Sequence, residues 1–172
     1  MQMNGPKISG LPSWMSSSLN KKETKLNLTG DRSWAGQPVI NTIRVNLRKN
    51  DSVTGIIVDR AMAASWRFNG TDGRNAFIFK SQAGAITKRT NSIINFKKDS
   101  APDKFIFSNT TPKDPFNHMQ RFVIKNFGKE DSIILKNIGQ TFRARDLRSL
   151  GDNKYSLPGI SPTKITVVTD LL

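Results

Sequence analysis

The sequence has no cysteine and a single histidine, His118, in 172 residues. The absence of thiols excludes disulfides, iron-sulfur clusters, thiol catalysis and zinc sites built on cysteine. One histidine cannot form a histidine-based zinc site, and no acid or elbow motif accompanies it for a serine-histidine relay. His118 is therefore predicted to be a solvated residue of the loop 110–120.

Long apolar runs and acidic residues are also scarce. No apolar segment reaches the roughly 20 residues of a membrane-spanning helix, and residues 1–25 lack the apolar core of a Sec signal peptide. The chain has 13 Asp and Glu against 27 Lys and Arg, a net charge of +14. We therefore expect an anionic polymer or surface as partner: a glycan, a nucleic acid or lipid head groups.

The motifs of common enzyme classes are missing as well. The sequence contains no P-loop, no Rossmann fingerprint and no metal-binding HExxH motif. Glycosidic chemistry needs two acids brought together, and nothing in the sequence marks such a pair. We predict that the protein is not an enzyme.

Short apolar runs, separated by Gly, Pro, Asn, Asp and Thr, occupy most of the chain. They are too closely spaced to leave room for crossover helices. The predicted strands are 26–28, 39–46, 53–58, 76–79, 92–96, 104–108, 121–127, 132–137 and 163–169. Only 59–66 is predicted as a helix of one or two turns, and 142–150 is either a short helix or irregular.

The pattern predicts one all-β domain, residues 26–172, made of short stacked strands. Residues 1–25 contain scattered Gly, Pro, Ser and Lys with too few apolar residues for a core, and are predicted to be a flexible basic arm. The middle of the domain is expected to resemble a β-roll or solenoid, and a β-sandwich is the alternative.

The stretch 126–137, NFGKEDSIILKN, is repeated with variations at 46–55, 68–79 and 95–109. In each copy an apolar anchor precedes a polar turn, an Asp or Asn follows, and apolar residues come next. The anchors are Leu47, Phe68, Phe96 and Phe127, at a spacing typical of repeated supersecondary units. Stacked copies are expected to place the Phe anchors in one core column and the Asp and Asn residues in an outer column.

The string GTDGRNAF at 70–77 resembles the glycine- and aspartate-rich nonapeptide of RTX proteins. The segments 91–109 and 121–137 resemble those that follow the nonapeptides in serralysin-type C-terminal domains and cyanobacterial RTX proteins. The resemblance covers roughly residues 41–138 and implies a parallel β-roll that binds Ca²⁺. The candidate calcium ligands that it implies are Asp51, Asp72, Asp103 and Asp131.

The sequence departs from the RTX pattern in its ligands and its charge. Where the family tends to have Asp, this chain has Asn75, Asn91, Asn95 and Asn126. Ca²⁺ sites draw much of their affinity from several carboxylates, so the resemblance supports the scaffold more directly than the metal. The end of the chain, 167–172, is similar to the acidic residue and apolar tail of some type I secretion signals, which implies an extracellular location.

Basic clusters provide candidate anion-binding residues, because Lys and Arg neutralise phosphates and other anions. The candidates are Lys97, Lys98, Arg143, Arg145 and Arg148. The alternative is a solvated face that keeps a β-rich protein soluble and guards its strand edges.

These observations predict a secreted or surface module of RTX-like β-roll type without catalytic activity. It would present basic loops to anionic surfaces or assemble with other copies of itself. One alternative is a structural protein of a virion or another assembly, tethered by the arm 1–25. Another is a nucleic-acid-binding protein, although the Phe residues lie among apolar neighbours, where burial is expected rather than base stacking.

Overall fold

The computed structural model describes residues 5–22, 24–31, 40–49, 52–61, 64–81, 89–109 and 120–172. Within these ranges the chain is all-β, as predicted. Helical backbone there is confined to two 3₁₀ turns, η2 (Lys136–Ile138) and η3 (Ala144–Asp146).

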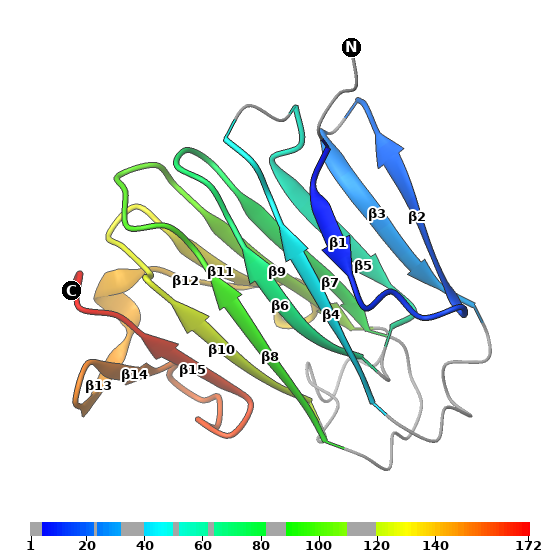
Figure 1. Cartoon of the computed structure of the whole chain (residues 1–172). Helices are drawn as coiled ribbons and strands as arrows, with labels where there is room; N and C mark the ends of the chain where they lie inside the picture. The colour runs from blue at the N-terminus through cyan, green and yellow to red at the C-terminus, as the bar shows by residue number, and fades with distance from the viewer. Residues whose placement is uncertain are drawn as a thin grey trace.

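The strands form two sheets (Figure 1). In spatial order, sheet 1 consists of β1 (Lys7–Ser9), β4 (Asn41–Asn46), β6 (Ala64–Asn69), β8 (Thr90–Asn95), β10 (Gln120–Lys125), β15 (Ile165–Val168), β14 (Lys154–Ser156) and β13 (Arg148–Gly151). Sheet 2 consists of β12 (Gln140–Phe142), β11 (Ser132–Leu135), β9 (Lys104–Asn109), β7 (Ala76–Ser81), β5 (Gly55–Asp59), β3 (Lys25–Gly30) and β2 (Met15–Asn20).

Successive strands from β3 to β11 alternate between the two sheets, and neighbours within each sheet are parallel. Each coil of the chain therefore contributes one strand to each sheet. This is the connectivity of a two-sheet solenoid and not of a sandwich built from hairpins. The colours of Figure 1 accordingly run in order along the stack, from the N-terminal to the C-terminal coils.

The core lies between the sheets and is dominated by phenylalanine. Phe77 stacks on Phe105 with ring centroids 5.7 Å apart, and Phe79 stacks on Phe107 at 5.5 Å. Phe122, from sheet 1, meets all four rings edge-on. Both geometries are favoured by the ring quadrupole, and each pair adds about 0.5–1.5 kcal/mol beyond the burial of its area.

The predicted column of phenylalanine anchors is wrong at one position. The N–H of Leu47 donates to the carbonyl of Asn69, and that of Gly70 donates to the carbonyl of Asn95, so Gly70 is level with Leu47 and Phe96. Phe68 is buried two residues earlier, inside β6. A Cβ at Gly70 would lie 2.5 Å from an Asn75 side-chain oxygen, which explains why this coil lacks an aromatic anchor.

The predicted helix at 59–66 is also wrong. β5 ends at Asp59, and β6 begins at Ala64. Ala64 and Trp66 are buried in the core, and packing between the sheets has overridden the helical propensity of the alanines. The other segment, 142–150, contains η3 and β13.

The segment predicted as a flexible arm contains two strands. β1 pairs with β4 and β2 pairs with β3, both antiparallel. Trp14 and Met15 are only 5% and 7% exposed. An edge strand is held largely by backbone hydrogen bonds to its neighbour, so it needs few apolar side chains. At the other end, β12 pairs antiparallel with β11, and β13 and β14 continue sheet 1 in the same way.

Candidate functional site

An asparagine ladder joins the coils where the strands of sheet 1 end. The Asn69 side-chain amide donates to Oδ1 of Asn46 at 2.6 Å, that of Asn95 to Asn69 at 3.1 Å, and that of Asn126 to Asn95 at 2.8 Å. These residues are 23, 26 and 31 positions apart. The ladder therefore keeps the strands in register although the coils differ in length.

A second column of polar residues precedes the strands of sheet 2. Oδ1 of Asp103 accepts the Asn75 N–H at 2.7 Å, and Oδ1 of Asp131 accepts the Asp103 N–H at 2.8 Å. Oδ2 of Asp131 accepts the Gly128 N–H at 2.7 Å. Asn75, Asp103 and Asp131 are 4%, 1% and 3% exposed, so the predicted outer column is in fact buried. Its side chains bind backbone donors of the turns and of the preceding coil.

The two buried carboxyls titrate abnormally. Burial raises the pKa of Asp103 to about 8, and the charges of Asp131 and Asp99 add to the effect. Burial also raises the pKa of Asp131, while the N–H donors of Gly128 and Asp103 oppose the rise. Oδ2 of Asp103 is buried without a hydrogen-bond partner. Asp103 is therefore protonated at neutral pH.

The four predicted calcium ligands are placed differently from one another. Asp103 and Asp131 are neighbours in the buried column, whereas Asp72 is exposed in the turn before β7. Asp51 and His118 lie outside the described residues. Among the residues that the structure describes, no three His, Asp or Glu side chains form a group that could hold a metal ion. Calcium binding stays a prediction.

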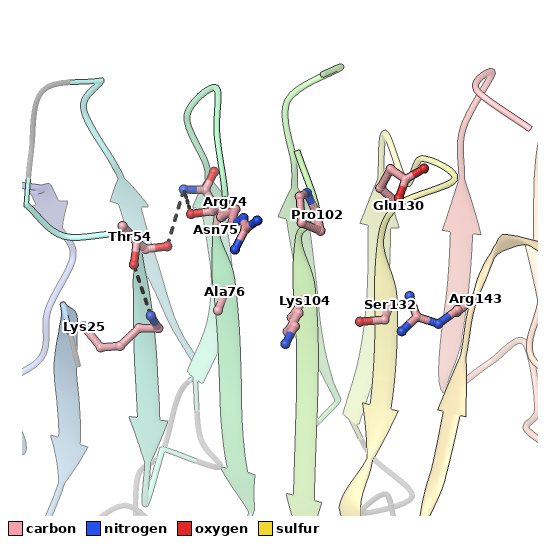
Figure 2. Close-up of a pocket in the computed structure, with 10 residues that line it drawn as sticks. All are labelled: Lys25, Thr54, Arg74, Asn75, Ala76, Pro102, Lys104, Glu130, Ser132 and Arg143. Carbon is pink, nitrogen blue, oxygen red and sulfur yellow. Dashed lines mark hydrogen bonds between the residues drawn. The ribbon is translucent and has the colours of Figure 1, made fainter. Parts of the chain in front are cut away.

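A groove of about 530 Å³ crosses the outer face of sheet 2 where its strands begin (Figure 2). The residues that line it come from β3, β5, β7, β9 and β11 or the turns before them, and from Arg143, which follows β12. They are Lys25, Thr54, Arg74, Asn75, Ala76, Pro102, Lys104, Glu130, Ser132 and Arg143. The Lys25 ammonium donates to the Thr54 hydroxyl at 3.1 Å, which holds one end of the groove in place.

The register of sheet 2 explains why these residues form a row. Lys25 pairs with Gly55, Gly55 with Ala76, Ala76 with Lys104, and Lys104 with Ser132. Side chains at one level of a parallel sheet point to the same face. The next residue of each strand points inward to the core, as Phe77 and Phe105 do. The groove therefore runs across the strands, along the solenoid.

One of the predicted anion-binding residues lies in the groove. Arg143 lines the groove, but Lys97, Arg145 and Arg148 are exposed elsewhere. Lys98 forms an ion pair with Asp170 at 2.8 Å.

The sequence placed Lys25 in a basic cluster that could bind anions, but it did not single out Arg74 and Lys104, although all three line the groove. Lys25 and Lys104 each stand directly before the apolar run of a strand. A comparison of the residue before the apolar run in successive repeats could have indicated that Lys25 and Lys104 lie on the same row.

Comparison with protein-family models, curated proteins and solved structures finds no match to this chain. The resemblance to RTX proteins therefore stays a prediction. Within the described ranges, no helix is long and apolar enough to cross a membrane. The arguments for function that follow rest on the geometry of the groove.

Proposed function

We propose that this protein is a non-catalytic interaction module that holds an anionic polymer or surface in the groove of sheet 2. The observation that carries the proposal is the charge of the groove. Among the residues that the structure describes, four cations line it, Lys25, Arg74, Lys104 and Arg143, against the single carboxylate of Glu130. A concave site lined by one sign of charge concentrates counter-ions and speeds their association.

The position of the titratable groups supports a role without catalysis. Catalytic groups with perturbed pKa values are usually exposed to a cleft. Here the perturbed carboxyls, Asp103 and Asp131, are buried beneath the groove and accept backbone N–H bonds. Asp131 closes the turn that carries Glu130 through the Gly128 N–H, and Asp103 ties its coil to the preceding one through the Asn75 N–H.

The two ladders support the proposal in another way. Side-chain hydrogen bonds tie each coil to the next on both sheets, so the cations on the groove stand at fixed intervals. A preorganised binding surface loses little conformational entropy when its ligand binds.

The test compares two double variants that change the net charge equally. Lys104→Glu with Arg143→Glu alters the groove, and Arg145→Glu with Arg148→Glu alters exposed residues outside it. Binding to immobilised heparin is measured over a series of salt concentrations. We expect the groove variant to elute at much lower salt than the control variant. Equal effects of the two variants would show that only the net charge matters and would refute the proposed site.

Calcium binding, implied by the resemblance to RTX proteins, is kept as a separate proposal. The supporting observations are that β3 to β11 alternate between two sheets, parallel to their neighbours within each sheet, and that Asp103 and Asp131 accept backbone N–H groups in successive coils. If Ca²⁺ binds the folded chain, millimolar Ca²⁺ raises the melting temperature and EDTA lowers it. Calorimetry with and without Ca²⁺ checks this, and an unchanged melting temperature would contradict it.

A further inference from the structure

The cations of the groove are widely spaced. Strands in a sheet are about 4.8 Å apart, so Lys25 and Lys104, three strands apart in the register, are separated by about 14 Å. Arg143 adjoins β12, two strands beyond Lys104, at about 10 Å. With one carboxylate among four cations, the described residues of the groove have a net charge of +3.

This charge density is too low to match a nucleic acid. Duplex DNA carries one charge per about 1.7 Å of its axis, so a segment as long as the groove would carry several times the charge of the cations that face it. Single strands are usually held by bases stacked on aromatic side chains. None of the residues that line the groove is aromatic.

An apolar strip runs beside the basic row on the same face of sheet 2. Ile57 pairs with Ile78, Ile78 with Ile106, and Ile106 with Ile134. All four side chains are half-buried, two residues along their strands from the groove row. A polymer lying across the strands would therefore meet cations and polar groups on one side and aliphatic side chains on the other.

Small residues leave room for such a polymer. Ala76 and Ser132 line the groove between the cations, and Gly55 lies in register between Lys25 and Ala76. A Cβ at Gly55 would lie 2.2 Å from the Ala76 carbonyl oxygen, so this position excludes every larger residue. The cations are thus separated by positions that have small side chains or none.

We propose that the ligand is a linear acidic polysaccharide with no more than one carboxylate or sulfate per sugar, lying along the groove from β3 to β12. Sugar rings supply an aliphatic C–H face for the isoleucine strip, and their hydroxyls supply donors and acceptors for Thr54. The acidic groups pair with Lys25, Lys104 and Arg143. This inference rests on the proposed function and specifies its ligand class.

The experiment measures binding of three labelled probes to the full chain by fluorescence anisotropy at several salt concentrations. The probes are an oligogalacturonate long enough to span the groove, a single-stranded oligothymidylate of equal length, and neutral dextran. We expect the oligogalacturonate to bind more tightly than the other two at physiological salt. Its slope of log affinity against log salt should not exceed about three in magnitude, because the groove has a net charge of +3.

Variants locate the site. Lys104→Gln and Arg143→Gln should each weaken oligogalacturonate binding by roughly three- to ten-fold, and Lys104→Arg should restore it. Ile106→Thr should weaken oligogalacturonate but not oligothymidylate. Lys97→Gln, outside the groove, is the matched control and should have no effect. Circular dichroism verifies that each variant is folded.

The outcomes separate the two proposals. Tighter binding of oligothymidylate than of oligogalacturonate would overturn the polysaccharide and leave the anion-binding function standing. Binding of neither anionic probe above the level of dextran would overturn both. Oligogalacturonate binding that is indifferent to Lys104→Gln and Arg143→Gln would overturn the groove as its site.

Discussion

The residues of the buried column, Asn75, Asp103 and Asp131, make different hydrogen bonds although they occupy similar positions in successive coils. Asp131 uses both carboxylate oxygens to accept backbone N–H groups. Asp103 uses one oxygen, and the other has no partner. Asn75 occupies the equivalent place one coil earlier with an amide. The fold thus accepts Asn at one level of the column, and the single bond that Asp103 accepts from the Asn75 N–H of the preceding coil can also be accepted by a neutral side chain.

We predict that Asp103→Asn removes a pH dependence of stability. The pKa of Asp103 is about 8 in the folded chain, against an ordinary value of 3.8. The folded state therefore holds a proton that the unfolded state releases, and this contribution is complete below about pH 4 and lost as the pH rises to about 8. The variant should match the native chain near pH 4 and exceed its stability by roughly 5–6 kcal/mol above pH 8, because each unit of pKa difference corresponds to about 1.4 kcal/mol. Urea unfolding across this range measures the difference.

Asp131→Asn is the contrasting variant. An amide can accept only one of the two N–H bonds and turns a donor toward the other N–H, so we expect the variant to lose about 1–3 kcal/mol of stability near neutral pH.

If the stability of Asp103→Asn depends on pH as steeply as that of the native chain, Asp103 is ionised in the fold, and the first prediction is contradicted.

At the scale of elements, the sequence patterns predicted the positions of the strands better than their register. Runs such as 104–108 and 132–137 coincide closely with β9 and β11. The register was misjudged at Phe68, because the coil with Gly70 has no apolar anchor to compare with Phe96. The groove was not predictable, since it joins Lys25 to Arg143 through pairings between distant strands.

The N-terminal strands are predicted to act as a cap that prevents assembly. β1 and β2 cover the edges of β4 and β3, and uncovered edges of this kind pair with other chains. A chain that lacks residues 1–20 should form concentration-dependent oligomers or aggregates, detected by light scattering. Removal of residues 1–6 leaves both strands and is the control. Loss of an existing assembly on the longer truncation would instead support a tether role for this segment.

At the scale of the whole molecule, electrostatics opposes the packing that holds the coils together. The net charge of +14 is spread over a stack whose described ion pairs include Lys98 with Asp170, both exposed. Self-repulsion of this kind destabilises a compact state. The two ladders and the phenylalanine core therefore hold the solenoid against its own charge, and an anionic ligand would relieve that repulsion.

We therefore predict that sodium chloride raises the melting temperature. Screening shortens the range of repulsion from about 30 Å at 0.01 M salt to about 8 Å at 0.15 M. Chloride is chosen because sulfate stabilises proteins by exclusion from their surface. The control is Lys97→Glu with Arg148→Glu, which lowers the net charge from +14 by four, since each substitution replaces a cation with an anion. Its melting temperature should start higher at low salt and rise less. A melting temperature that is unchanged or falls with salt would mean that the charge is already balanced locally, and repulsion would then not limit the stability of the fold.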